Sequence, residues 1–104
     1  MIKVSVLYPN GEGNRFDMDY YCSRHMPMVQ AKLGSACKAV AVEQGLGGGE
    51  PGAPATYVAM GHMIFESLEE FQAAFGPHAA TLTADLPNYT DIKPVVQISS
   101  IILG

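Results

Sequence analysis

ATYVAMGHMIFESLEEF, residues 55–71, runs from an apolar strand directly into a capped helix. Residues 55–65 contain β-branched and aromatic side chains, which favour a strand. One face of that strand would carry Tyr57, Ala59, Gly61, Met63 and Phe65, and the other Val58, Met60, His62 and Ile64. Ser67 and Glu70 form a capping box, in which the serine accepts from an early helical amide and the glutamate reaches back. We therefore predict a strand that is apolar on both faces, followed by a helix.

Towards the C-terminus, Gly76-Pro77 ends this helix, and a second helical stretch is predicted over residues 78–86. Residues 87–90, PNYT, form a turn or loop. The last strand, VVQISSIIL, covers residues 95–103 and is again apolar on both faces.

Towards the N-terminus, residues 45–54 hold five glycines and two prolines, which predicts a loop. A phosphate-binding loop would need a helix directly after the glycines, and no helical pattern follows these. A strand over residues 37–46 precedes this loop, and residues 2–8, IKVSVLY, form the first strand. Tyr8 falls on the same face of that strand as Ile2, Val4 and Val6.

A helix lies between these two strands. Asp17 is a suitable N-cap, and Gly34 is a natural stop. Spacings of three and four residues place several side chains on one helical face: Met18, Tyr21, His25, Met28, Val29 and Leu33. Pro27 lacks the N–H that a helix interior uses, so we expect a kink around residues 23–27.

The resulting β-α-β-β-α-β order predicts one domain over residues 1–104, an α+β ferredoxin-like fold with helices on one side of a four-stranded antiparallel sheet. The opposite face should be polar in a monomer, but the third and fourth strands are apolar on both faces. Charged residues make up only 15% of the chain, well below the usual share. We therefore expect a homodimer that covers this face with a second copy.

Composition also excludes several partners. A net charge of -4 with six Lys and Arg does not suit nucleic acid, and no apolar run is long enough to span a membrane. The N-terminus leads straight into a strand and offers no signal-peptide core, so a cytoplasmic location is expected. Cys22 and Cys37 lack CxxC spacing and read as free thiols. The three histidines are scattered and have no Cys or Glu at ligand spacing, so we predict no metal.

Several segments resemble the EthD family: Phe16-Asp17, Tyr20-Tyr21, His25-Met26-Pro27, residues 65–71, residues 85–91 (DLPNYTD) and residues 96–99 (VQIS). The resemblance implies a dimeric α+β barrel, in which two ferredoxin-like subunits pack sheet to sheet. The family is named for a gene of bacterial ether degradation, and its relatives include cofactor-free lactone isomerases, polyketide-type dehydratases and small monooxygenases. It implies a pocket between helices and sheet, with His25 as the acid–base group. Tyr89 stands where many members carry Phe, which adds a hydroxyl.

The predicted catalytic residues are His25 and Tyr21. An imidazole exchanges a proton near neutral pH, and Tyr21 lies one helical turn earlier on the same face. The structural alternative is a satisfied core histidine beside a packed tyrosine. The predicted substrate contacts are Tyr8, Met28, Phe65 and Tyr89. Of the remaining candidates, Tyr20 is expected at an edge or at the subunit contact, His62 at the subunit contact, and His78 in solvent or at a pocket rim. No nucleophile-elbow motif supports a Ser-His-Asp triad.

Two functions follow as hypotheses. The first is a cofactor-free enzyme of isomerase, lyase or monooxygenase type, which moves protons on a small apolar oxygenated molecule such as a lactone, an enolisable aromatic or an ether-degradation product. The second is a non-catalytic binding or accessory protein, whose cavity holds a hydrophobic small molecule in ether or xenobiotic degradation. The residues themselves do not choose between them.

Overall fold

The computed structural model describes residues 1–104 and contains one four-stranded antiparallel sheet. Its strands are β1 (Ile2–Pro9), β2 (Ala39–Gln44), β3 (Tyr57–Phe65) and β4 (Val95–Ser100). They lie in the order β2-β3-β1-β4, and every neighbouring pair is antiparallel. This arrangement confirms the predicted α+β ferredoxin-like fold.

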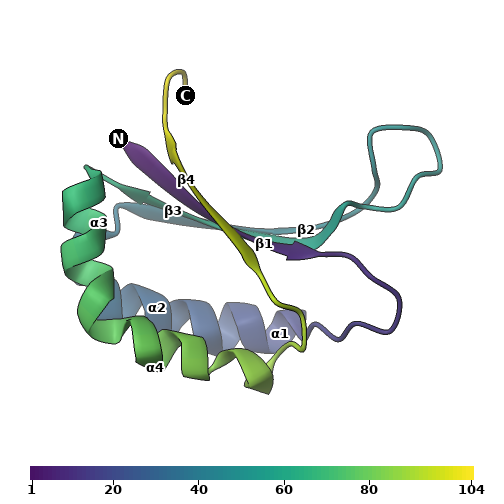
Figure 1. Cartoon of the computed structure of the whole chain (residues 1–104), viewed down its shortest axis with the longest axis horizontal. Helices are drawn as coiled ribbons and strands as arrows, with labels where there is room; N and C mark the ends of the chain where they lie inside the picture. The colour runs from purple at the N-terminus through teal and green to yellow at the C-terminus, as the bar shows by residue number, and fades with distance from the viewer.

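The helices all lie on one side of the sheet (Figure 1). The first helical segment is continuous and consists of α1 (Met18–Tyr20), a π-helical turn η1 (Tyr21–His25) and α2 (Met26–Leu33). The second consists of α3 (Leu68–Phe75) and α4 (Ala79–Ala84). Short 3₁₀ turns complete the helical segments: η2 (Gly34–Ala36), η3 (Gly76–His78) and η4 (Leu86–Asn88). No helix has both the length and the apolar character needed to cross a membrane.

Both predicted helix starts have the expected side-chain N-cap. The Asp17 carboxylate accepts from the Tyr20 amide at 3.0 Å, and the Ser67 hydroxyl accepts from the Glu70 amide at 3.2 Å. Gly34 has a φ of 62°, a left-handed conformation that ends α2. The Gly76-Pro77 pair forms a 3₁₀ turn that leads from α3 into α4.

The strands are shorter than the sequence pattern predicts. β2 ends at Gln44 instead of residue 46, and the Gly45 amide makes one further bond to the Val58 carbonyl of β3 at 2.9 Å. β4 ends at Ser100 instead of residue 103, because Ser100 is opposite Ile2, the first residue of β1. Beyond that point one backbone bond remains, from the Ile101 amide to the Met1 carbonyl at 3.1 Å.

The break expected near Pro27 takes the form of a widened turn. In η1 the Met26 amide donates to the carbonyl of Tyr21, five residues earlier. Pro27 follows at once and has no amide hydrogen to donate. Tyr21 and His25 stand at the two ends of this turn, and their rings are stacked with centroids 5.5 Å apart.

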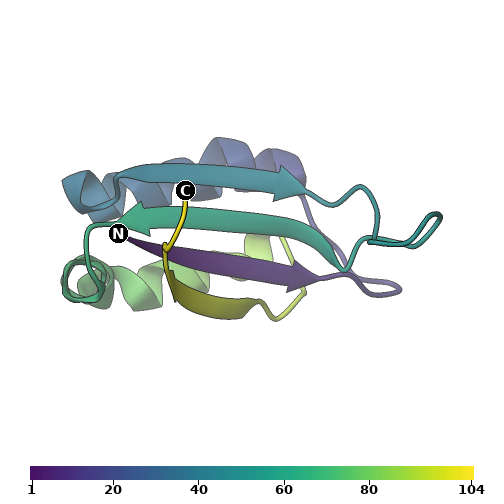
Figure 2. The same ribbon diagram turned by 90° about the horizontal axis from the view of Figure 1, so that it is seen from above.

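The predicted faces of β3 are confirmed by burial. Ala59, Met63 and Phe65 are buried beneath the helices, whereas Met60 and Ile64 are only half-buried on the opposite face. That opposite face has no cover in the single chain (Figure 2). At its centre His62 bonds the Ser5 hydroxyl through Nδ1 at 2.8 Å and the Glu43 carboxylate through Nε2 at 3.2 Å.

Candidate active site

A cavity of about 660 Å³ lies between the helical layer and the sheet. Val6 and Tyr8 of β1 and Gly61 and Met63 of β3 form its sheet wall. The helical segments supply most of the opposite wall: Tyr21, His25, Met26, Val29, Phe75, Leu82 and Leu86. Residues 90–94 and Val96, with Arg15, complete its edge. Its walls are mainly apolar, so the few polar groups on them determine its chemistry.

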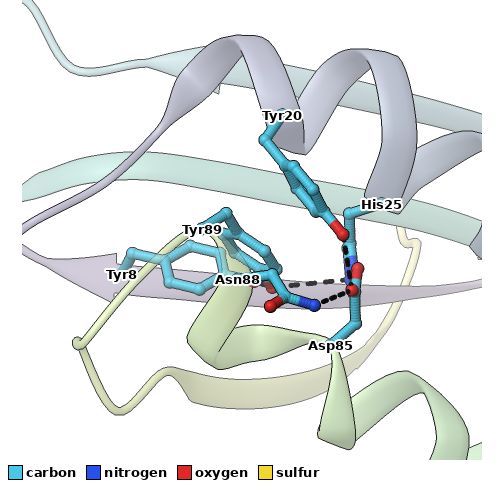
Figure 3. A network of polar contacts seen from close by, with 6 residues as sticks. All are labelled: Tyr8, Tyr20, His25, Asp85, Asn88 and Tyr89. Atoms are coloured by element: carbon cyan, nitrogen blue, oxygen red, sulfur yellow. Dashed lines mark hydrogen bonds and ion pairs between the residues drawn. The ribbon is translucent and has the colours of Figure 1, made fainter.

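His25 is a buried titratable side chain on the wall of this cavity. It ends η1 and is only 6% exposed. Its Nδ1 lies 2.8 Å from Oδ2 of Asp85, a residue that directly follows α4 (Figure 3). An ionised carboxylate can only accept, so Nδ1 carries the proton and donates to Asp85. When the ring is neutral, Nε2 is therefore bare and able to take a proton.

Asp85 is itself held by two further donors. The Tyr20 hydroxyl donates to Oδ1 at 2.7 Å, and the Asn88 amide donates to the same oxygen at 2.9 Å. Burial acts to raise the pKa of the Asp85 carboxyl, but the hydrogen bonds from Asn88, His25 and Tyr20 together hold that pKa below its ordinary value. Asp85 is therefore ionised at neutral pH and fixes the orientation of the His25 ring.

Asp85→Asn should lower the free energy of unfolding by about 1–3 kcal/mol at neutral pH, because the hydrogen bonds lose a charged acceptor. The lowered pKa of Asp85 means that its contribution is present above its ordinary value of 3.8 and lost as the pH falls through the lowered value. Urea unfolding at pH 7 and at pH 3 should therefore show a smaller difference between wild type and variant at pH 3. Glu50→Gln, in the exposed loop, is the control and should show little difference at either pH. A difference for Asp85→Asn that does not shrink in acid would contradict this assignment.

Two buried tyrosine hydroxyls extend the network from His25 to the sheet. The Tyr89 hydroxyl lies 3.4 Å from Nε2 of His25 and 2.8 Å from the Tyr8 hydroxyl. With Nε2 bare, Tyr89 donates to His25 and Tyr8 donates to Tyr89. Burial raises the pKa of both tyrosines well above their ordinary value, so both stay protonated near neutral pH. The chain of hydroxyls therefore connects the bare nitrogen of His25 to Tyr8 on the cavity wall.

Tyr21 packs between His25 and the sheet. Its side chain is 2% exposed, and its ring lies 5.5 Å from those of both His25 and Tyr8. Its hydroxyl sits over Gly61 of β3, where a Cβ would overlap the hydroxyl oxygen. Gly61 is therefore the residue that lets Tyr21 lie flat against the sheet.

Gly61→Ala should displace Tyr21 and lower the free energy of unfolding by about 1–3 kcal/mol, because overpacking a tight site forces neighbours to move. Gly49→Ala is the control, since Gly49 lies in the exposed loop, does not precede a proline, has no positive φ and has open space around its missing Cβ. That control should be neutral or slightly stabilising. Thermal unfolding of the two variants compares them directly. Equal stabilities would show that Tyr21 can shift without cost.

The structure brings together most of the predicted site residues. His25, Tyr21 and Tyr8 line the cavity, and Tyr89 touches His25 and Tyr8 from behind the wall. Phe65 does not line it: it lies opposite Ile2, at the other end of β1 from Tyr8, and packs on Phe71. Met28 is half-buried on α2 and is also absent from the cavity walls.

Several functional candidates were missed or misplaced by sequence reasoning. Asp85, Asn88 and Arg15 carried no individual signal, although Asp85 and Asn88 stand in the DLPNYTD segment. Tyr20, expected at an edge or at the subunit contact, is half-buried and bonds Asp85, a contact that the sequence did not indicate. His78 is half-buried in η3 and does not line the cavity. No group of three or more His, Cys, Asp or Glu residues is placed together as metal ligands.

The chain is similar to a known protein family and to several solved structures. The family described as the EthD domain matches residues 11–93. A crystal structure of an EthD-like protein from Ralstonia eutropha JMP134 is 55% identical, covers 98% of this chain and 92% of its own, and superposes with a TM-score of 0.94. An ethyl tert-butyl ether degradation (EthD) family protein from Bacillus halodurans C-125 is 17% identical, with coverages of 98% and 99% and a TM-score of 0.68. A protein from Arabidopsis thaliana shares the fold at 15% identity, with coverages of 100% and 98% and a TM-score of 0.70. No curated protein matches the chain.

Proposed function

The chain belongs to the EthD family, and we propose that it is a small enzyme that catalyses proton transfer on an apolar, oxygen-bearing small molecule. The proposal covers reactions of isomerase, lyase or monooxygenase type that begin with the removal of a proton. It assigns the chemistry to the chain's own side chains, without a bound cofactor.

The observation that carries this proposal is the His25–Asp85 pair on the wall of an apolar cavity. A histidine placed only for packing needs no carboxylate on Nδ1, and the carboxylate here is bonded by three side chains. The same pairing gives a general base its correct tautomer and stabilises the imidazolium that forms when it takes a proton. The site therefore supports acid–base chemistry better than simple binding.

The geometry allows a proton to reach His25 in two ways. A substrate C–H or O–H beside the ring can give its proton to Nε2 directly. Alternatively, the substrate proton passes to the Tyr8 oxygen while the Tyr8 proton passes to Tyr89 and the Tyr89 proton to Nε2. Either route leaves an imidazolium paired with the Asp85 carboxylate and an anionic substrate. Reversal at a second substrate position completes an isomerisation, and loss of a leaving group completes a lyase reaction.

The remaining walls suit a substrate that is small and mostly apolar. Met26, Val29, Met63 and Leu82 offer hydrocarbon and thioether surface, while the Tyr21 and Tyr8 hydroxyls can orient a substrate oxygen. The relative from Bacillus halodurans is described as an ethyl tert-butyl ether degradation family protein. We extend this to the present chain as a role in the breakdown of ethers or other xenobiotics.

The open face of the sheet supports a dimer as part of the same proposal. Its apolar side chains include Leu7, Met60, Ile64 and Val95, and Val95 is 49% exposed in the single chain. A second copy would cover this face with the same face, giving the sheet-to-sheet barrel. Obligate interfaces of this kind bury more than about 2,000 Å².

Deuterium exchange tests the enzymatic proposal on a panel of compounds that need not include the natural substrate. Small lactones and enolisable phenols and ketones are incubated with the protein in D₂O, and proton NMR follows loss of the carbon-bound proton. The proposal predicts exchange well above the buffer rate for at least one compound. Compounds that bind, shown by saturation transfer, but never exchange would instead favour the binding-protein alternative.

A further inference from the structure

The edge of the cavity carries two cations. Arg15 and Lys93 line it, and together they make up two of the six Lys and Arg residues in a chain of net charge -4. Eleven of the 20 residues that line the cavity are hydrophobic. Positive charge at the edge of an otherwise apolar cavity is suited to a ligand with an anionic end and an apolar body.

Backbone contacts hold Arg15 beside the segment that carries Lys93. The Arg15 amide donates to Oδ1 of Asp91 at 2.8 Å, and its carbonyl accepts from the Thr90 hydroxyl at 2.7 Å. One guanidinium nitrogen, Nη2, donates to the Pro87 carbonyl at 2.8 Å. Lys93 follows Asp91 by two residues and precedes Pro94, which disfavours helical backbone at Lys93. These contacts fix where the Arg15 group sits and leave most of its five donors free.

Neither cation is neutralised within the chain. The two ion pairs in the structure both involve histidines, His25 with Asp85 and His62 with Glu43. Asp91 is the one carboxylate among the lining residues, and it accepts the main-chain amide of Arg15. The cavity lining therefore carries two cationic side chains, Arg15 and Lys93, and one carboxylate, Asp91. The carboxylate of nearby Asp85 is paired with His25.

We propose that Arg15 and Lys93 bind a carboxylate or similar anion on the ligand, so that the substrate class is an amphiphilic organic acid. The guanidinium offers paired donors that match a carboxylate, and Lys93 supplies a second, mobile ammonium. The apolar body of the ligand then extends along the cavity towards His25. This inference rests on the proposed function only in using the same cavity.

Two fluorescent dyes test the charge preference directly. 1-Anilinonaphthalene-8-sulfonate and N-phenyl-1-naphthylamine share the same aromatic body, and only the first carries an anion. The wild-type protein should bind the anionic dye about 10-fold or more tightly than the neutral dye, since charge-assisted hydrogen bonds each contribute about that factor. Equal affinities, or a preference for the neutral dye, would overturn the proposal.

Substitutions test whether Arg15 and Lys93 cause the preference for the anionic dye. Arg15→Gln combined with Lys93→Gln should reduce the preference to about 1-fold and leave the neutral dye unaffected. Lys32→Gln combined with Lys38→Gln removes the same net charge from exposed positions outside the cavity and should keep the preference. The Lys93 side chain is exposed and makes no hydrogen bond in the structure. Lys93→Gln alone should partially weaken the preference for the anionic dye, even if the double variant folds poorly. A preference unchanged in Lys93→Gln and in the double variant contradicts the proposal.

Dye preference and deuterium exchange in the wild-type protein separate this inference from the enzymatic one. Wild-type preference without any deuterium exchange would overturn only the proposed enzyme. Deuterium exchange without a preference would overturn only the acid-binding site.

Discussion

His25→Asn should lower the rate of deuterium exchange by about 10²–10⁴-fold, the usual contribution of a positioned general acid or base. Asparagine keeps a polar side chain of similar size, but it has no nitrogen that takes up a proton near neutral pH. The asparagine amide at position 25 would still be a hydrogen-bonding partner for Asp85 and Tyr89. The measured quantity is the initial exchange rate on a compound that the wild-type protein exchanges, with circular dichroism to show that the fold is retained.

His78→Asn is the matched control for this change. His78 is half-buried in η3, but it does not line the cavity, so its loss should leave the exchange rate within about 2-fold of wild type. A His25→Asn variant that is folded and exchanges at the normal rate would show that His25 is structural. In that case the binding-protein alternative would be favoured.

Met60→Glu should raise the dissociation constant of the proposed dimer by about 10²–10⁴-fold, because an unpaired charge buried at an interface costs about 3–5 kcal/mol. Met60 lies on the open face of β3, opposite Leu7 on one side and Glu43 on the other. The new carboxylate would therefore stand beside Glu43 and find no cation there. Analytical ultracentrifugation over micromolar concentrations should show wild-type dimers and variant monomers.

Two controls separate dimer loss from a general effect of charge. Met60→Leu keeps an apolar side chain of similar volume and should preserve the dimer. Gln72→Glu adds the same charge to the exposed surface of α3, away from the sheet, and should also preserve it. A wild-type protein that is a stable monomer at micromolar concentration would rule out the dimer itself.

The fold could be predicted because its signals are local. The two-residue alternation of β3 correctly identified Ala59, Met63 and Phe65 as the helix-facing side. Asp17 and Ser67 correctly marked the helix starts. Strand ends were less predictable, since they depend on which residue of a neighbouring strand remains to pair. The end of β4 at Ser100, opposite Ile2, is the clearest case.

The site was harder to predict, and the π-helical turn is one physical reason. Regular helical spacing from Tyr21 and His25 places Met28, Val29 and Leu33 on one face, and Val29 and Leu33 are buried as expected. Met28 is only half-buried and does not line the cavity, whereas Met26, which regular spacing leaves off that face, is buried and lines it. A sequence pattern that assumes 3.6 residues per turn therefore does not place every side chain next to such a turn correctly.

Sequence distance is the second reason. Asp85 is 60 residues from His25, and it meets His25 only because α4 ends next to η1. Nothing local in the sequence pairs these two residues. The DLPNYTD segment indicated the right region, through the family resemblance, without indicating which atom its carboxylate would hold.

The tautomer of the His25 ring is the most direct test of the claim that this site performs acid–base chemistry. Nitrogen-15 NMR of the ring in the free protein, recorded at a pH where the imidazole is neutral, distinguishes the protonated nitrogen from the bare one. The structure predicts that Nδ1 is protonated, towards Asp85, and that Nε2 is bare, towards the Tyr89 hydroxyl. A ring with its proton on Nε2 could not accept a proton there, either directly or through Tyr89 and Tyr8, and would contradict the account.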